Sequence, residues 1–134
     1  MDLGALGLLT PDLEPRPETV EVLATLESVL KRAPGHPGAA HYYIHTVEAG
    51  PNPEKALDAA KRLQTAMPGA GHLVHMPSHI YLRLGRYAEA SEWNSQGDRR
   101  RRCVPGQGNP QAFYMMYVAH NHQVPDGVLH VRGA

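Results

Sequence analysis

Hydrophobic residues recur at helical spacing along the first two thirds of the chain. Between Glu18 and Arg32 they are Val22, Leu23, Leu26, Val29 and Leu30. This spacing predicts an amphipathic helix. Further helices are expected over residues 37–49, 53–66 and 71–84, and another near Arg86, because proline and glycine punctuate the chain between them. No stretch of four or more residues alternates convincingly between apolar and polar positions, so the pattern predicts an all-α protein without strands.

The helical pattern also repeats at a fixed distance along the chain. The dipeptide Pro34–Gly35 recurs as Pro68–Gly69, 34 residues later. The same offset relates three further pairs, which are Pro17 and Pro51, His41 and His75, and His45 and His79. A fixed period of this size is typical of stacked helix–turn–helix units. The period therefore predicts an array of antiparallel helix–turn–helix repeats.

Specific motifs resemble a known repeat family. The hexapeptide Gly85-Arg86-Tyr87-Ala88-Glu89-Ala90 resembles the turn and second-helix start of a tetratricopeptide repeat. The two histidine-containing stretches, residues 36–45 and 71–80, resemble a His-rich bacterial subfamily of such proteins. The resemblance implies a tetratricopeptide-like α-solenoid of about two and a half repeats over residues 1–96, whose first helices line a concave groove. It also implies that the chain is a fragment of such a protein.

The remainder of the chain does not follow this pattern. Residues 97–112, which include the run Arg99–Arg102, are expected to form a basic irregular linker, residues 113–123 a partial further helix, and residues 124–134 a disordered tail. GC-rich DNA that is translated in a shifted reading frame also gives basic segments rich in glycine and proline. Both readings stay open: a genuine basic loop and tail, or a frameshifted or cloning-derived segment.

The composition excludes several classes of protein. Thirteen basic and 13 acidic residues balance, which gives no support to nucleic-acid binding through bulk charge. No apolar run approaches the ~20 residues of a membrane span, and Leu3–Leu9 makes a poor secretory signal, so a cytoplasmic protein is expected. The single cysteine, Cys103, excludes an intrachain disulfide and a cysteine-based zinc site. Unfinished repeats leave apolar faces open, which predicts a homo-oligomer.

The chain has nine histidines, and their spacing indicates a metal site. Two pairs are four residues apart, so each pair shares one helix face. Glu48 and His72 lie three residues from these pairs and join the same faces. Because the 34-residue period stacks the two helices about 8–10 Å apart, the imidazoles are expected to share one ion. The predicted metal ligands are His41, His45, His72, His75, His79 and, on a further helix, His120.

The chemistry of such a site remains open at the sequence level. A histidine-rich, thiolate-free ligand set favours copper or zinc. A copper site suggests an oxidase, whereas zinc with an open position suggests a hydrolase in which Glu48 is the general base. The alternatives are a tetratricopeptide scaffold that binds a peptide or small molecule in its groove, and a truncated product that folds by oligomerising. His36 is expected to cap a helix, and Pro77 to kink one.

Overall fold

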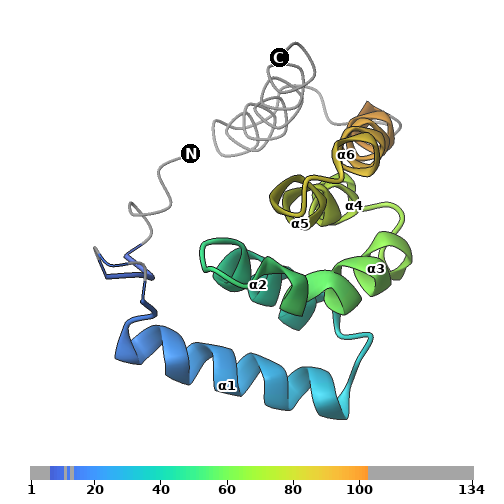
Figure 1. Ribbon diagram of the computed structural model, residues 1–134. Helices are drawn as coiled ribbons and strands as arrows, with labels where there is room; N and C mark the ends of the chain where they lie inside the picture. Colours follow the sequence, from blue (N-terminus) through green and yellow to red (C-terminus); the bar gives the residue numbers. More distant parts are fainter. Residues whose placement is uncertain (1–6, 11, 13, 103–134) are drawn as a thin grey trace.

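The computed structural model describes residues 7–10, 12 and 14–102, and this part of the chain is helical (Figure 1). The elements are α1 (Pro17–Arg32), α2 (Pro37–Glu48), the 3-10 turn η2 (Pro53–Ala56), α3 (Leu57–Ala66), α4 (Gly71–His75), α5 (Pro77–Arg83) and α6 (Tyr87–Arg102). In the described residues, extended pairing is confined to an isolated bridge between Leu9 and Pro15. The prediction of an all-α chain is therefore confirmed for this part.

Helices that follow one another in the chain pack against one another. The helix α2 contacts α1 on one side and α3 on the other, and it also reaches α5 (Figure 1). The helix α6 packs against both α4 and α5. The result is a stack of helices in chain order, with α2 between α1 and α3.

The helix boundaries follow the period of the sequence. The helices α1 and α3 end at Arg32 and Ala66, and the next residues, Ala33 and Met67, have nearly the same backbone angles (φ −136° and ψ 77°; φ −140° and ψ 76°). The helices α2 and α4 begin at Pro37 and Gly71, again 34 residues apart. The chain therefore leaves α1 and α3 in the same backbone conformation, just before the repeated Pro–Gly turns.

The helix expected over residues 71–84 is divided in two. The helix α4 ends at His75 and α5 begins at Pro77, with Met76 between them in the right-handed helical conformation. Proline has no backbone N–H and its ring clashes with the preceding turn, so the helical hydrogen bonds cannot run through this position. The prediction of a single helix was wrong here, and the kink expected at Pro77 is a break between two helices. The expected helix over residues 53–66 likewise begins as η2 before α3.

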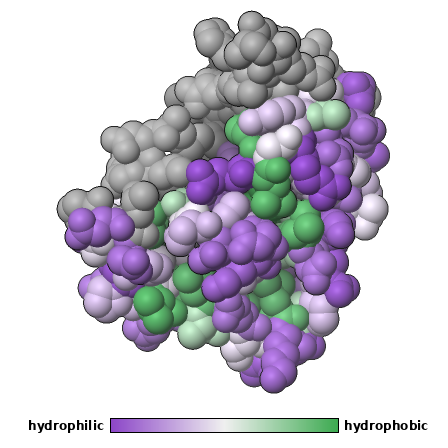
Figure 2. Space-filling model, viewed as in Figure 1, coloured by the Kyte–Doolittle hydropathy of each residue, from purple (hydrophilic) through white to green (hydrophobic). Residues whose placement is uncertain are grey.

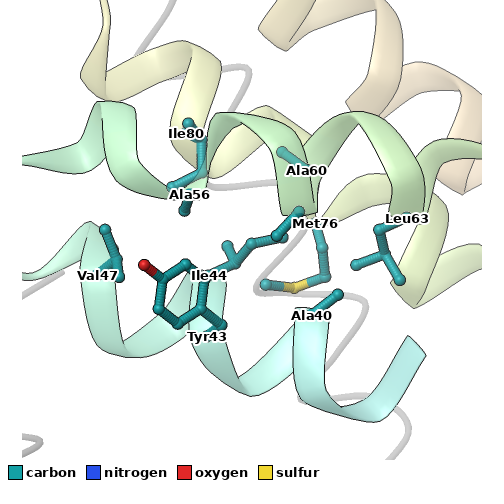
Figure 3. Close-up of a cluster of buried hydrophobic side chains, with 10 residues drawn as sticks. Ala40, Tyr43, Ile44, Val47, Ala56, Ala60, Leu63, Met76 and Ile80 are labelled. Carbon is teal, nitrogen blue, oxygen red and sulfur yellow. The ribbon is translucent and has the colours of Figure 1, made fainter. Parts of the chain in front are cut away.

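The hydrophobic core lies between one face of α2 and the helices stacked on it (Figure 3). The helix α2 contributes Ala40, Tyr43, Ile44 and Val47, which are spaced three or four residues apart and so share a face. The facing elements supply Ala56, Ala59, Ala60, Leu63, Met76 and Ile80. The side chain of Met76 is fully buried. Because this face of α2 is buried in the core, residues 41, 45 and 48 lie on another face.

Most of the described surface in Figure 2 is hydrophilic, with hydrophobic residues in small separate patches. The large hydrophobic side chains that are exposed include Val20 and Val22 on α1 and Tyr42 on α2, which is 63% exposed. Tyr42 thus occupies the outward side of α2. Of the helices in the described part, none combines the length and apolar character that crossing a bilayer requires.

The helix α6 continues beyond the boundary expected at residue 96 and ends at Arg102. The start of the expected irregular linker is therefore helical, and the basic run belongs to the last turn of this helix. Residues 103–134, with the expected partial helix and tail, lie outside the described residues. At Gly97 the helix passes close to α4: a Cβ atom there would lie 2.7 Å from the carbonyl oxygen of Gly71 and 2.7 Å from the Cβ of His75.

We expect Gly97→Ala to lower the free energy of unfolding by about 1–2 kcal/mol. Alanine gains up to about 1 kcal/mol over glycine within a helix, but overpacking costs about 1–3 kcal/mol, and the atoms it meets here belong to backbone and Cβ, which cannot rotate away. Urea denaturation measures the change. The matched control is Gly69→Ala, because a Cβ at Gly69 meets nothing within 4 Å. An unchanged or increased stability of Gly97→Ala would contradict the observed approach of α6 to α4.

A hydrogen bond between α1 and α2 makes the free energy of unfolding change with pH in the alkaline range. The hydroxyl of Tyr43 donates to Glu27 Oε1 at 3.0 Å. Burial, together with this bond to a carboxylate, raises the pKa of Tyr43 to about 12. The folded state therefore keeps the phenol protonated at a pH where the unfolded chain, with a pKa of 10.0, loses the proton.

The contribution of the hydrogen bond between Tyr43 and Glu27 to stability is accordingly present below pH 10 and is lost as the pH rises towards about 12. We expect Tyr43→Phe to flatten this part of the curve of unfolding free energy against pH. Urea denaturation at a series of pH values measures it, with Tyr42→Phe as the control at an exposed neighbour. Parallel curves for Tyr43→Phe and wild type over this range would show that the bond does not form.

Candidate metal centre

Five histidines and one glutamate from three helices form a single polar cluster beside the core. His41, His45 and Glu48 come from α2, His72 and His75 from α4, and His79 from α5. We call this set the histidine cluster. On α2 the three residues share a face that adjoins the core, since they are spaced by four and three residues. Contact between α2 and α5 brings Glu48 to His79.

Three members of the cluster lie close enough to hold one metal ion. His41, His45 and His72 each offer a nitrogen atom, and these atoms lie within 4.8 Å of one another. The Nε2 atoms of His41 and His72 are 3.1 Å apart. Two nitrogen ligands of a tetrahedral zinc ion with bonds of about 2.0–2.1 Å are separated by about 3.3 Å. The closest pair already has nearly this separation, and an ion would draw the third ring inward.

Glu48 holds an imidazole of this three-histidine group in a fixed orientation. Its Oε1 lies 2.8 Å from Nδ1 of His45, and its Oε2 lies 2.6 Å from Nδ1 of His79. Burial by itself raises the pKa of Glu48, but the hydrogen bonds from His45 and His79 and the electrostatic attraction of these rings outweigh it and lower the pKa to about 2. An ionised carboxylate only accepts, so both Nδ1 atoms donate. In the neutral ring of His45, Nε2 is then the atom that can bind a metal.

This arrangement does not favour the general-base role predicted for Glu48. Each of its oxygens accepts a hydrogen bond from an imidazole, and the residue is 5% exposed. A base with a pKa of about 2 also takes up a proton poorly near neutral pH. Glu48 is therefore better described as the residue that orients His45 and His79.

The protonation state of His41 suits metal binding. Burial lowers the pKa of His41 to about 4, with a further lowering by His45 and His79 and an opposing effect of Glu48. Its ring packs against those of its neighbours, 4.9 Å from the ring centre of His45 and 5.0 Å from that of His72. His41 is thus neutral near pH 7, and a neutral imidazole is the form that binds a metal.

His75 and His79 form a second, more deeply buried set, being 0% and 6% exposed. Their Nε2 atoms lie 2.9 Å apart. Nδ1 of His75 lies 2.6 Å from Oδ1 of Asn94 on α6, with Ser78 Oγ at 3.3 Å. That all the predicted histidines share one ion therefore stays a prediction, since in the described part of the chain the group within 4.8 Å is His41, His45 and His72. His72 turns towards His41 of α2, whereas His75, three residues further along, turns towards α6.

Asn94 was missed by the sequence analysis, although a signal for it exists. It lies four residues after Ala90 and three before Gly97, so it shares the face of α6 formed by these two small residues, and it is 1% exposed. A polar residue on such a face requires a partner. The nature of that partner, His75, depends on how α6 packs on α4, which local spacing does not reveal.

The remaining sequence predictions have different outcomes. His36 precedes α2 and caps it, since its Nδ1 accepts a hydrogen bond of 3.1 Å from the backbone N–H of Ala39, which confirms the expected cap. His120, the sixth predicted ligand, lies outside the described residues. A surface cleft of about 360 Å³ between α1, α2 and α3 is lined by residues such as Lys31, Tyr43 and Arg62 and by none of the clustered histidines.

Comparison of the chain with protein-family models, with curated proteins and with solved structures finds no match in any of the three. The function therefore has to be argued from the chemistry of the site, because helical architecture alone does not determine function.

Proposed function

We propose that this protein binds a transition-metal ion through His41, His45 and His72. The observation that carries the proposal is the approach of their three nitrogen atoms to within 4.8 Å of one another. Two features support it. Glu48 holds His45 with Nε2 available as a ligand, and His41 is neutral at physiological pH.

Zinc and copper are the ions that this ligand set favours. All three ligands are imidazoles, which suit either ion, and a set of three leaves one position of a tetrahedral ion for water or substrate. Such an open position is typical of catalytic rather than structural zinc sites. The ion would supply an activated water for hydrolysis or, as copper, an electron-transfer centre for oxidation. The protein residues would hold and orient it, with Glu48 fixing one ring.

We further propose that the metal site is built on tetratricopeptide-like repeats. The support is the 34-residue offset between the ends of α1 and α3 and between the starts of α2 and α4. Successive repeats place equivalent helices side by side. In this arrangement the duplicated histidine pairs of α2 and of α4–α5 become neighbours, which brings residues far apart in the sequence into one cluster.

Elemental analysis of protein purified without an affinity tag tests the proposal. We expect His41→Ala/His72→Ala to carry about one zinc or copper ion per chain less than wild type, because two of the three ligands are removed. The control is His36→Asn, which removes an imidazole outside the cluster and keeps a good helix-capping residue. Equal metal content in wild type and the double variant would overturn the proposed site.

A further inference from the structure

The buried pair His75 and His79 has a feature that the three-histidine site does not use. The Nδ1 atom of each ring faces an oxygen acceptor: Glu48 Oε2 at 2.6 Å from His79, and Asn94 Oδ1 at 2.6 Å from His75. A neutral imidazole carries a single N–H, so a ring that donates from Nδ1 has a lone pair on Nε2. When both rings are neutral in this tautomer, each therefore directs a lone pair from Nε2 towards the same point.

These two lone pairs lie close together in a buried place. The Nε2 atoms are 2.9 Å apart, and the rings are 0% and 6% exposed. Two lone pairs at this separation repel each other, and water screens the repulsion poorly inside a protein. A cation between them removes the repulsion, and its nitrogen ligands would be separated by about 3.3 Å if the ion were tetrahedral.

We propose that His75 and His79 bind a second transition-metal ion through their Nε2 atoms, so that the histidine cluster is a two-metal centre. The proposal deepens the proposed function and rests on it, since the second ion lies beside the first. The two sets are contiguous: the ring centres of His72 and His75 are 5.9 Å apart, and those of His45 and His79 are 5.6 Å apart.

Glu48 connects the two positions. One of its oxygens orients His45 of the first set and the other orients His79 of the second. Its negative charge lies between the rings that would hold two positive ions, which offsets part of their mutual repulsion.

The competing arrangement uses a proton instead of a metal. If the amide of Asn94 is reversed, Nδ2 donates to His75 Nδ1, and His75 can then donate from Nε2 to His79. In that case the pair is an ordinary buried hydrogen bond and binds no ion. The two arrangements differ in the number of ions bound per chain and in their magnetic coupling.

Copper(II) loading of the full chain tests the proposal. The protein is saturated with copper(II) and desalted, and the copper per chain from elemental analysis is compared with the spins per copper from electron paramagnetic resonance. We expect two coppers per wild-type chain and fewer spins than coppers, because adjacent ions couple. We expect one copper with a full spin count in His75→Gln and also in His41→Ala/His72→Ala. Circular dichroism checks that each variant folds, and the wild-type result stands if one does not.

The other outcomes separate the two proposals. One uncoupled copper that is lost in His41→Ala/His72→Ala overturns the second site and leaves the proposed function intact. One copper that is lost only in His75→Gln overturns the three-histidine site. Two coppers without coupling overturn the paired centre, because the second ion then binds elsewhere, and no copper overturns both proposals.

Discussion

Replacing His72 by alanine is expected to weaken zinc binding at least about a hundredfold. His72 is the ligand that α4 contributes to the three-histidine group, and its Nε2 lies 3.1 Å from that of His41. Its loss leaves the pair on α2 to hold the ion from one side. Loss of a residue that merely orients a ligand costs about 10–100-fold in metal affinity, so loss of a ligand itself is expected to cost at least as much.

Competition against a chromophoric zinc chelator measures this affinity. The His36→Asn variant is expected to bind zinc as wild type does, because His36 caps α2 and stands outside the cluster. The affinity should also fall in acid for wild type, since protons compete with zinc for imidazole nitrogen. If His72→Ala retained wild-type affinity, the ion would have to be held by other residues.

The replacement of Glu48 by alanine is expected to affect both stability and metal binding. It removes the acceptor of two hydrogen bonds, one part-buried and one buried, and leaves the Nδ1 donors of His45 and His79 without their carboxylate. Each unsatisfied buried donor costs about 1–3 kcal/mol, so we expect a loss of about 3 kcal/mol in the free energy of unfolding. Without its orienting carboxylate, His45 should also bind the metal about 10–100-fold more weakly.

Urea denaturation and zinc titration measure the two effects of Glu48→Ala. The variant Glu48→Gln separates charge from shape: its amide keeps the size but can accept from only one of the two rings, so an intermediate loss is expected in both measurements. The account of Glu48 fails if the alanine variant matches wild type in both stability and affinity.

The helices themselves were largely predictable, because their signals are local. The spacing of Val22, Leu26 and Val29 predicts α1, and the Pro–Gly turns mark where helices end. The errors occur where two local signals compete. Apolar periodicity continues across Pro77, and the missing N–H of that proline divides the helix all the same. Similarly, the basic run ending at Arg102 looks irregular by composition but continues α6.

The residues of the histidine cluster could be predicted from the sequence, but the arrangement of their side chains could not. Spacing of three and four residues fixes which histidines share a helix face. The 34-residue period then predicts that the face with His41 and His45 lies near the helix that carries His72. It does not fix the direction in which that face points relative to the next helix. The separation of His75 from His72 depends on the close packing of α6 at Gly97, which places Asn94 beside His75. Such tertiary contacts leave little trace in the local sequence.

The central claim is that His41, His45 and His72 jointly hold a metal ion. Anomalous diffraction at the zinc absorption edge, from crystals grown with zinc, tests it most directly. The account predicts an anomalous peak among these three side chains, with zinc–nitrogen bonds of about 2.0–2.1 Å to each. A map with no peak at this position, while zinc is bound elsewhere on the chain or not at all, would contradict it.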